Sequence, residues 1–163
     1  MTTRYPMTEK GHALLQEELR RLITVERPAA SKAIGTAREH GDLSENAEYH
    51  AAKEAQGLLE ARIRDLENKL AGAQVVDVSK LSGEKVVFGA TVTISDAETG
   101  EERKVVIVGD EEADADKGRI SYQSPVARAL IGKSVDDLVR VKLPSGQKEY
   151  EILEVEFLEI DLS

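Results

Sequence analysis

From Thr8 onward, apolar residues recur at the spacing of a helix. Leu15, Leu19 and Leu22 are separated by four and then three positions, and charged residues fill the opposite face. This pattern predicts an amphipathic helix with Thr8 as its N-cap. Pro28 lacks a backbone N–H and crowds the carbonyl four residues earlier, so we expect a kink or short break there. Beyond it the apolar stripe restarts with small residues: Ala29, Ala33 and Ala37.

A second helical stripe follows a turn, and we expect its helix to begin between Leu43 and Glu45. Its apolar positions are again three and four apart: Ala52, Ala55, Leu59, Ile63, Leu66, Leu70 and Ala73. Sustained spacing of this kind is typical of a coiled-coil seam. Both stripes are Ala-rich near the turn and Leu-rich far from it, so antiparallel pairing matches like with like. We predict an antiparallel coiled-coil hairpin; an ordinary helical bundle is the alternative, but no third helix is available to cover the apolar faces.

After about Ser79 the period changes to that of short strands. The β-branched, partly alternating segments are separated by Gly, Asp or Ser: "KVVFGATVTI", "RKVVIVG", "GRISY", "DLVRVKL" and "KEYEILEVEF". One short helix interrupts them, with Ser124 as its cap, Pro125 in its first turn and Gly132 as its stop. The fold class is therefore α+β, with a hairpin domain over residues 1–78 and a small antiparallel sheet domain over residues 79–163.

Composition and charge exclude several classes of function. The chain has 163 residues and a net charge of −9, of which residues 1–79 carry −2 and residues 80–163 carry −7. This balance argues against a protein that wraps nucleic acid by itself, and it makes the N-terminal part the more tolerable neighbour for RNA or DNA. The absence of Cys excludes disulfides and thiolate metal sites. No apolar run resembles a signal peptide or a membrane span, so we expect a soluble cytoplasmic protein.

The turn between the two stripes holds a pair of acids, Asp42 and Glu45, three positions apart. One interpretation is structural: Gly41 ends the first helix in a left-handed conformation, and the two acids form a capping box for the second. The other is chemical. Mg²⁺ is commonly held by one or two carboxylates together with water and a phosphate, so two acids on a protruding tip could complete a two-metal site on a phosphodiester. The pattern alone leaves both interpretations open.

Other side chains near the turn suit a nucleic acid. Arg38 and Lys53 could hold phosphates, and Tyr49, one helical turn after Glu45, could stack on a base. The structural alternatives are solvated charges and a tyrosine that packs over the turn. His40 and His50 lack the partner spacing of a zinc site, and we predict no metal ligation by histidine.

The segment "AREHGDLSENAEYHAAKE", followed by "GLLEARIRDLENKLAGAQVVD", resembles the coiled-coil tip of the bacterial GreA transcript-cleavage factors. The similarity continues through "IVGDEEADADKGRIS", "SPVARALIGK" and "VKLPSGQKEYEILEVEF", nearly to the end of the chain. It implies an N-terminal hairpin that enters the secondary channel of RNA polymerase and an FKBP-like C-terminal domain that docks at the channel mouth. It also implies an accessory factor, not an enzyme, that stimulates the polymerase to cut the 3′ end of backtracked nascent RNA.

The resemblance assigns roles to particular residues. It implies that Asp42 and Glu45 are the catalytic acids, which place a Mg²⁺ only jointly with the polymerase active centre. No Mg²⁺ is expected to bind stably to the isolated protein. Arg38 and Lys53 match positions that hold the transcript, and Tyr49 is expected to contact RNA beside them. The docking surface is expected around the short helix, whose apolar residues stand in an acidic domain: Ser124, Pro125, Val126 and Leu130.

Sequence differences among the relatives make the resemblance to GreA stronger than that to the other members. The GreB relatives carry a large basic patch on the hairpin, whereas this N-terminal region is slightly acidic, and inhibitory relatives have an altered tip, whereas "GDLSENAEY" is intact. A factor that binds the polymerase channel without cleavage is one alternative function. A prolyl isomerase is another, although its aromatic-rich pocket would have to come from very few aromatic residues. We expect a monomer that binds RNA polymerase and no membrane.

Overall fold

The computed structural model describes residues 4–41 and 46–163, and it divides into two compact units. The first comprises Met1–Arg4 and His12–Ala73, and the second comprises Tyr5–Gly11 and Gln74–Ser163. The first unit is the helical hairpin and the second is the sheet domain. The strand and first helical turn at the beginning of the chain thus belong to the sheet domain, although they precede the hairpin in sequence.

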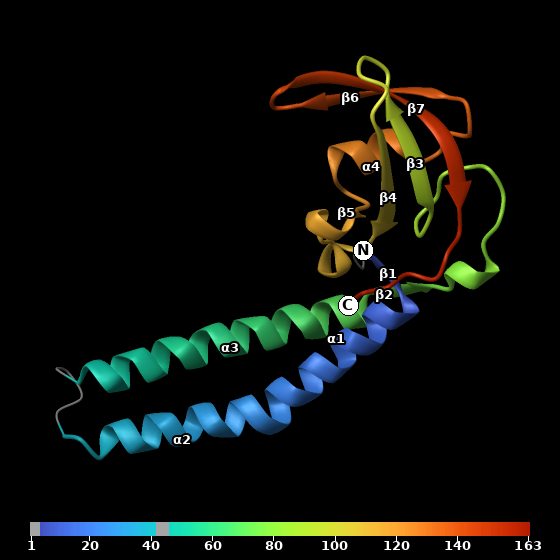
Figure 1. Cartoon of the computed structure of the whole chain (residues 1–163). Helices are drawn as coiled ribbons and strands as arrows, with labels where there is room; N and C mark the ends of the chain where they lie inside the picture. The colour runs from blue at the N-terminus through green and yellow to red at the C-terminus, as the bar shows by residue number, and fades with distance from the viewer. Residues whose placement is uncertain (1–3, 42–45) are drawn as a thin grey trace. The chain divides into compact units, whose positions relative to one another are not determined.

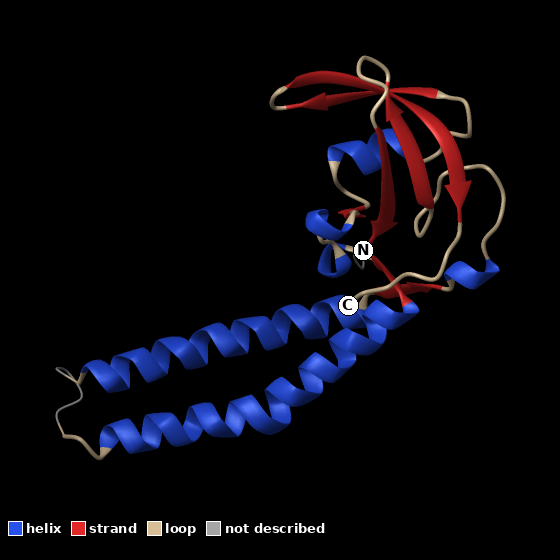
Figure 2. Ribbon diagram, viewed as in Figure 1, coloured by secondary structure: helices blue, strands red, loops and turns tan. Residues whose placement is uncertain are grey.

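The hairpin is built from three α-helices and one short segment of different hydrogen bonding (Figure 1). In chain order these are α1 (Glu9–Arg21), a π-helical segment (Leu22–Glu26), α2 (Arg27–Arg38) and α3 (Ala47–Ala71). Figure 2 shows that α3 returns beside the first arm, as in an antiparallel pair. The predicted coiled-coil hairpin is confirmed, and no other long helix occurs among the described residues.

The π-helical segment explains how the chain accommodates Pro28. It lies directly before the proline and is closed by the N–H of Arg27, which donates to the carbonyl of Leu22 five residues earlier. Pro28 has no N–H to donate to the carbonyl of Thr24, four residues earlier. The hydroxyl of Thr24 itself donates to the carbonyl of Arg20 at 2.8 Å. The α-helical ladder is therefore interrupted where the sequence predicted a kink or break.

The same segment corrects the predicted apolar stripe. A turn with i→i+5 bonds contains one residue more than an α-helical turn, so the buried face moves on by one position. Ala29 and Ala33 are exposed, whereas Ala30 is half-buried and Ile34 is buried. Ala37, three positions after Ile34, is buried as predicted. The predicted burial of Ala29 and Ala33 is wrong because the prediction assumed regular α-helical spacing past Pro28.

The stripe on α3 is largely as predicted. Ile63 and Leu66 are fully buried, Ala52, Leu59 and Leu70 are half-buried, and Ala55 is exposed. The helix ends at Ala71 with Gly72 as its C-cap, so Ala73 belongs to the following strand and not to the helix. Burial is thus deepest in the part of the hairpin where leucine and isoleucine meet, and it thins toward the turn.

The second unit has two sheets. β1 (Tyr5–Thr8) pairs with β2 (Ala73–Val76), and a five-stranded sheet has the order β5-β4-β3-β7-β6. Its strands are β3 (Thr91–Asp96), β4 (Glu102–Val108), β5 (Arg119–Ser121), β6 (Leu138–Leu143) and β7 (Gly146–Glu156). Neighbours run antiparallel except β4 and β5, which are parallel, so the predicted antiparallel sheet is corrected to a mixed one.

The core of this unit lies between the sheet and the short helix α4 (Pro125–Leu130). Its buried residues include Ile94 from β3, Ile107 from β4, Ile152 from β7 and Leu130 from α4. Three 3₁₀ turns connect the strands, at Val78–Lys80, Asp110–Glu112 and Ala115–Lys117. The alternation of buried and exposed positions along β6 and β7 is what fixes their register.

Within this unit, Glu112 holds the beginning of α1. Thr8 caps the helix as predicted, because its hydroxyl oxygen accepts from the N–H of Gly11 at 3.0 Å. The carboxylate of Glu112 accepts from the Thr8 N–H at 3.0 Å and also from the Thr8 hydroxyl. Glu112 is only 6% exposed. No local pattern in the sequence predicts this partner, which lies 104 residues from Thr8.

Gly11 tests this arrangement. A Cβ at Gly11 would lie 2.5 Å from the carboxyl carbon of Glu112, so Gly11→Ala has to displace a buried side chain from its bonds to Thr8. We expect a loss of stability of about 1–3 kcal/mol. Gly57→Ala is the matched control, because a Cβ there meets nothing within 4 Å, and it should stabilise α3 by about 0.5–1 kcal/mol. Thermal melts of both variants check this, and equal effects of the two would contradict it.

Candidate functional site

The turn of the hairpin is flanked by residues that the structure describes on both sides. α2 ends at Arg38, and Gly41 has a φ of +111°, in keeping with the turn glycine predicted there. α3 begins at Ala47 with Asn46 as its N-cap. The predicted start between Leu43 and Glu45 is therefore wrong. Asp42 and Glu45, the predicted catalytic acids, lie outside the described residues.

Asn46 joins the two helices. Its side-chain Oδ1 accepts from the N–H of Tyr49 at 3.0 Å, which caps α3. Its Nδ2 donates to the carbonyl of Ala37 in the last turn of α2, at 2.6 Å. The capping role that the sequence assigned to Asp42 thus belongs to Asn46. The signal was available, since Asn caps a helix as well as Asp does, but the pair Asp42 and Glu45 fits the same motif.

Two of the three predicted RNA-contacting residues meet beside this bond. The guanidinium carbon of Arg38 lies 6.0 Å from the ring centroid of Tyr49, the range of a cation–π contact. Tyr49 also meets His50 edge-on, with ring centroids 5.7 Å apart. Lys53 is exposed, four positions after Tyr49 and therefore on the same face of α3. The three side chains form one surface next to the turn.

A third contact across the turn involves His40 and Glu48. The imidazole Nε2 of His40 lies 3.3 Å from a carboxylate oxygen of Glu48, in the first turn of α3. The acid also lies at the positive end of the α3 dipole. Ala37 with Asn46, Arg38 with Tyr49 and His40 with Glu48 are thus three contacts between the end of α2 and the start of α3.

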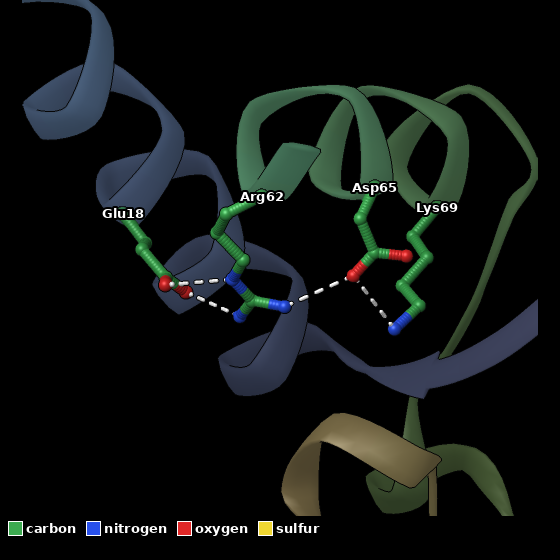
Figure 3. A network of polar contacts seen from close by, with 4 residues as sticks. All are labelled: Glu18, Arg62, Asp65 and Lys69. Atoms are coloured by element: carbon green, nitrogen blue, oxygen red, sulfur yellow. Dashed lines mark hydrogen bonds and ion pairs between the residues drawn. The ribbon is translucent and has the colours of Figure 1, made fainter. Parts of the chain in front are cut away.

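Ion pairs link the hairpin's arms farther from the turn. In Figure 3, Arg62 on α3 reaches Glu18 on α1, with its Nε and Nη2 donating to the two carboxylate oxygens at 3.1 and 2.9 Å. Its Nη1 donates to Asp65 at 3.0 Å, and Asp65 also accepts from Lys69 at 3.2 Å. Arg27 makes a similar bidentate pair with Glu60, both distances being 2.9 Å. Bidentate geometry favours one longitudinal alignment of the helices.

The predicted docking residues divide into accessible and buried ones. Ser124 caps α4 as predicted, with its hydroxyl oxygen 3.3 Å from the N–H of Ala127. Pro125 is exposed and Val126 is half-buried. Leu130 has no exposed surface and belongs to the core, so its predicted docking contact is corrected. The next residue, Ile131, is 38% exposed and carries the apolar surface instead. Gly132 has a φ of +90°, as its predicted role as helix stop requires.

Neither a metal centre nor a spanning helix is found in the described part of the chain. Over residues 4–41 and 46–163, no three His, Cys, Asp or Glu side chains are grouped so that they could bind a metal ion. The same residues contain no helix with the length and apolar character needed to cross a membrane. Any role of Asp42 and Glu45 in binding metal therefore rests on their chemistry and their place in the sequence.

Comparison with known proteins agrees with this architecture. Residues 5–75 match the family described as the N-terminal part of a transcription elongation factor, and residues 81–157 match the GreA/GreB C-terminal part. Transcription elongation factor GreA of Caulobacter sp. (strain K31) is 60% identical over 153 residues, or 94% of this chain and 98% of the relative. GreA of Psychrobacter sp. (strain PRwf-1) is 58% identical, covering 93% and 97%. A solved GreA factor homolog 1 of Thermus thermophilus is 29% identical, with coverage of 94% and 99% and a TM-score of 0.44.

The hairpin, the sheet domain, the two family matches and the similarity to curated GreA proteins define the class of protein as a bacterial transcription elongation factor. The chain belongs to the GreA family, as its turn motif predicted. Its role is that of an accessory factor, which stimulates the transcript cleavage of RNA polymerase and is not an enzyme on its own.

The Arg27–Glu60 pair gives a prediction about acid. Hydrogen bonding to Arg27 lowers the pKa of Glu60 below its usual 4.5, so the pair stabilises the fold above that pH and loses its effect as the pH falls through the lowered pKa. Arg27→Gln should therefore melt at a lower temperature than wild type at pH 7, and the difference should shrink and vanish as the pH falls through the lowered pKa of Glu60. Lys32→Gln, an exposed α2 cation without an ion pair among the described residues, is the control. A deficit that persists in acid would contradict the prediction.

Proposed function

We propose that the chain inserts its hairpin into the secondary channel of RNA polymerase and brings Asp42 and Glu45 to the polymerase active centre. The observation that carries the proposal is the hairpin itself: α3 runs for 25 residues, about 38 Å at about 1.5 Å per residue, up to the turn that contains both acids. Such a length can reach a site buried inside a partner. The sheet domain stays outside and docks.

The two acids supply chemistry that the rest of the hairpin lacks. Mg²⁺ is commonly bound by few carboxylates, with water and phosphate oxygens completing its shell. Asp42 and Glu45 would hold the second Mg²⁺ of a two-metal site together with the polymerase's own groups, and would orient the water that attacks the backtracked RNA. Neither acid needs to bind Mg²⁺ in the free protein, because the site is complete only in the complex.

The surface formed by Arg38, Tyr49 and Lys53 would hold the RNA. The two cations suit backbone phosphates, and the ring of Tyr49 suits a base, since stacking tolerates any sequence. Arg38 already contacts the Tyr49 ring in the free protein, so the cation and the aromatic face are arranged before RNA arrives. This arrangement would position the 3′ end of the transcript against the metal.

The sheet domain would dock on RNA polymerase through Ser124, Pro125 and Val126. This domain carries most of the chain's negative charge, which suits a basic partner surface and speeds association. Its binding would keep the hairpin at high local concentration in the channel. We propose a monomeric, cytoplasmic factor whose partners are RNA polymerase and the 3′ end of backtracked RNA.

The double variant Asp42→Asn/Glu45→Gln tests the chemistry. Because Asn46 caps α3, the stability of the hairpin should change by less than about 1 kcal/mol. Neutral amides do not hold Mg²⁺ as carboxylates do, so the variant should bind polymerase and no longer stimulate RNA cleavage. Raised Mg²⁺ should partly rescue either single variant. The measurements are the melting temperature and the cleavage rate on a backtracked complex.

Two outcomes would count against this role of the acids. If the double variant melts far lower while its cleavage per bound molecule is intact, the acids serve the fold alone. If wild-type protein binds the backtracked complex without shortening its RNA, the chain is a non-cleaving regulator of the channel.

A further variant tests docking. Pro125→Asp adds a charge at the exposed first position of α4, where an acidic residue is compatible with the helix dipole and folding should persist. We expect its affinity for polymerase to fall about tenfold or more, because a charge would be buried against the partner. Pro144→Asp, at another exposed proline of the same domain, should bind normally. Unchanged affinity of the Pro125 variant would remove this loop from the interface.

A further inference from the structure

Asn46 makes two bonds that face in opposite directions along the chain. Its Oδ1 satisfies the N–H of Tyr49 in the first turn of α3, and its Nδ2 satisfies the carbonyl of Ala37 in the last turn of α2. Ala37 is buried, and its carbonyl also accepts from the N–H of His40 at 3.2 Å. One amide side chain therefore connects an unpaired donor of one helix with a terminal carbonyl of the other.

On α3 the apolar seam thins toward this position, whereas Ile34 and Ala37 on α2 are buried. The deepest burial on α3 is at Ile63 and Leu66, and between them and Asn46 the seam residues Ala52 and Leu59 are only half-buried. Alanine side chains contribute little apolar area, so the first turns of α3 add little to the packing beside the turn. The described side-chain contacts across the turn are polar or aromatic, and among them Asn46 makes a direct hydrogen bond between the two arms.

We infer that Asn46 is a positioning residue for cleavage: its amide fixes the end of α2 against the start of α3 and so fixes both ends of the connection that carries Asp42 and Glu45. The inference rests on the proposed function of those two acids. Asn46 is adjacent to Glu45 in sequence and contacts neither RNA nor metal in this role. Loss of its bond to Ala37 would change where the acids are presented, without removing any group that reacts.

The two bonds can be separated by substitution. Asn46→Ser and Asn46→Asp keep an oxygen that caps α3, because Ser, Asp and Asn are comparable N-caps. Neither residue has an amide N–H that can reach Ala37, and Asn46→Ser adds no charge near the metal. Asn46→Ala removes both bonds. Asn68→Ser, at an exposed position near the far end of the same helix, controls for the change of residue type.

The experiment measures RNA cleavage in a backtracked complex against the concentration of full-length factor, with the melting temperature of each variant. For Asn46→Ser and Asn46→Asp we expect the maximal stimulated rate to fall about tenfold or more, because a misplacement of the order of 1 Å is costly in a metal-assisted reaction. The half-saturating concentration should stay within about twofold of wild type, since docking lies in the other unit. The melting temperature should change little, and Asn68→Ser should behave as wild type.

Two results would overturn the inference. If Asn46→Ser keeps the full maximal rate while Asp42→Asn abolishes it, Asn46 does not position the acids, and the proposed function stands. If the Asn46 variants change only the half-saturating concentration and the melting temperature, the residue is a helix cap alone. Full cleavage by Asp42→Asn and Glu45→Gln themselves would instead reject the proposed function, so the two failures are distinguishable.

Discussion

The hairpin depends on the narrow seam between its two arms. Two helices without a third bury only one stripe each, and here the fully buried pair on α3 is Ile63 and Leu66. Toward the turn, α3 contributes small or half-buried side chains to the seam, while Ile34 and Ala37 of α2 are buried, so apolar packing thins on the α3 side, near the proposed functional residues. Directional contacts take over there: the Asn46 amide on Ala37, Arg38 on Tyr49, and His40 beside Glu48. Alignment of the arms is set by bidentate arginine pairs farther along.

The polar contacts at the turn and the apolar packing farther along the hairpin bear on the proposed function in different ways. Small side chains on α3 near the turn suit the proposed entry of the hairpin into a channel, because bulky ones would widen it there. The polar contacts across the turn supplement the packing of Ile34 and Ala37. In the second unit the opposite holds, because a conventional core that includes Leu130 supports the exposed Pro125 and Ile131. The proposed function thus assigns chemistry to the first unit and affinity to the second.

The sequence predicted the hairpin, the strands and the cap at Thr8 because each rests on local periodicity or local hydrogen bonding. It misjudged Ala29 and Ala33 because the response of a helix to Pro28, here a π-helical turn, is not visible in a period count. It missed Glu112 because no local signal connects residues so distant in the chain. Asp42 was predicted as the cap because it forms a capping-box pattern with Glu45. Asn46 is an equally good capping residue, and the hydrogen bond from the Tyr49 N–H shows that it is the cap. Leu130 was taken for a surface residue because a short helix shows no clear inner face.

If the chain acts by completing a metal site, as we propose, it should change how RNA cleavage depends on Mg²⁺. The measurement is the rate of RNA cleavage in a backtracked complex over a range of Mg²⁺ concentrations, with and without saturating factor. We predict that the factor lowers the half-maximal Mg²⁺ concentration about tenfold or more, because two additional carboxylates stabilise the second ion. If the factor raises the rate at every Mg²⁺ concentration without moving the half-maximal value, it does not act by completing a metal site.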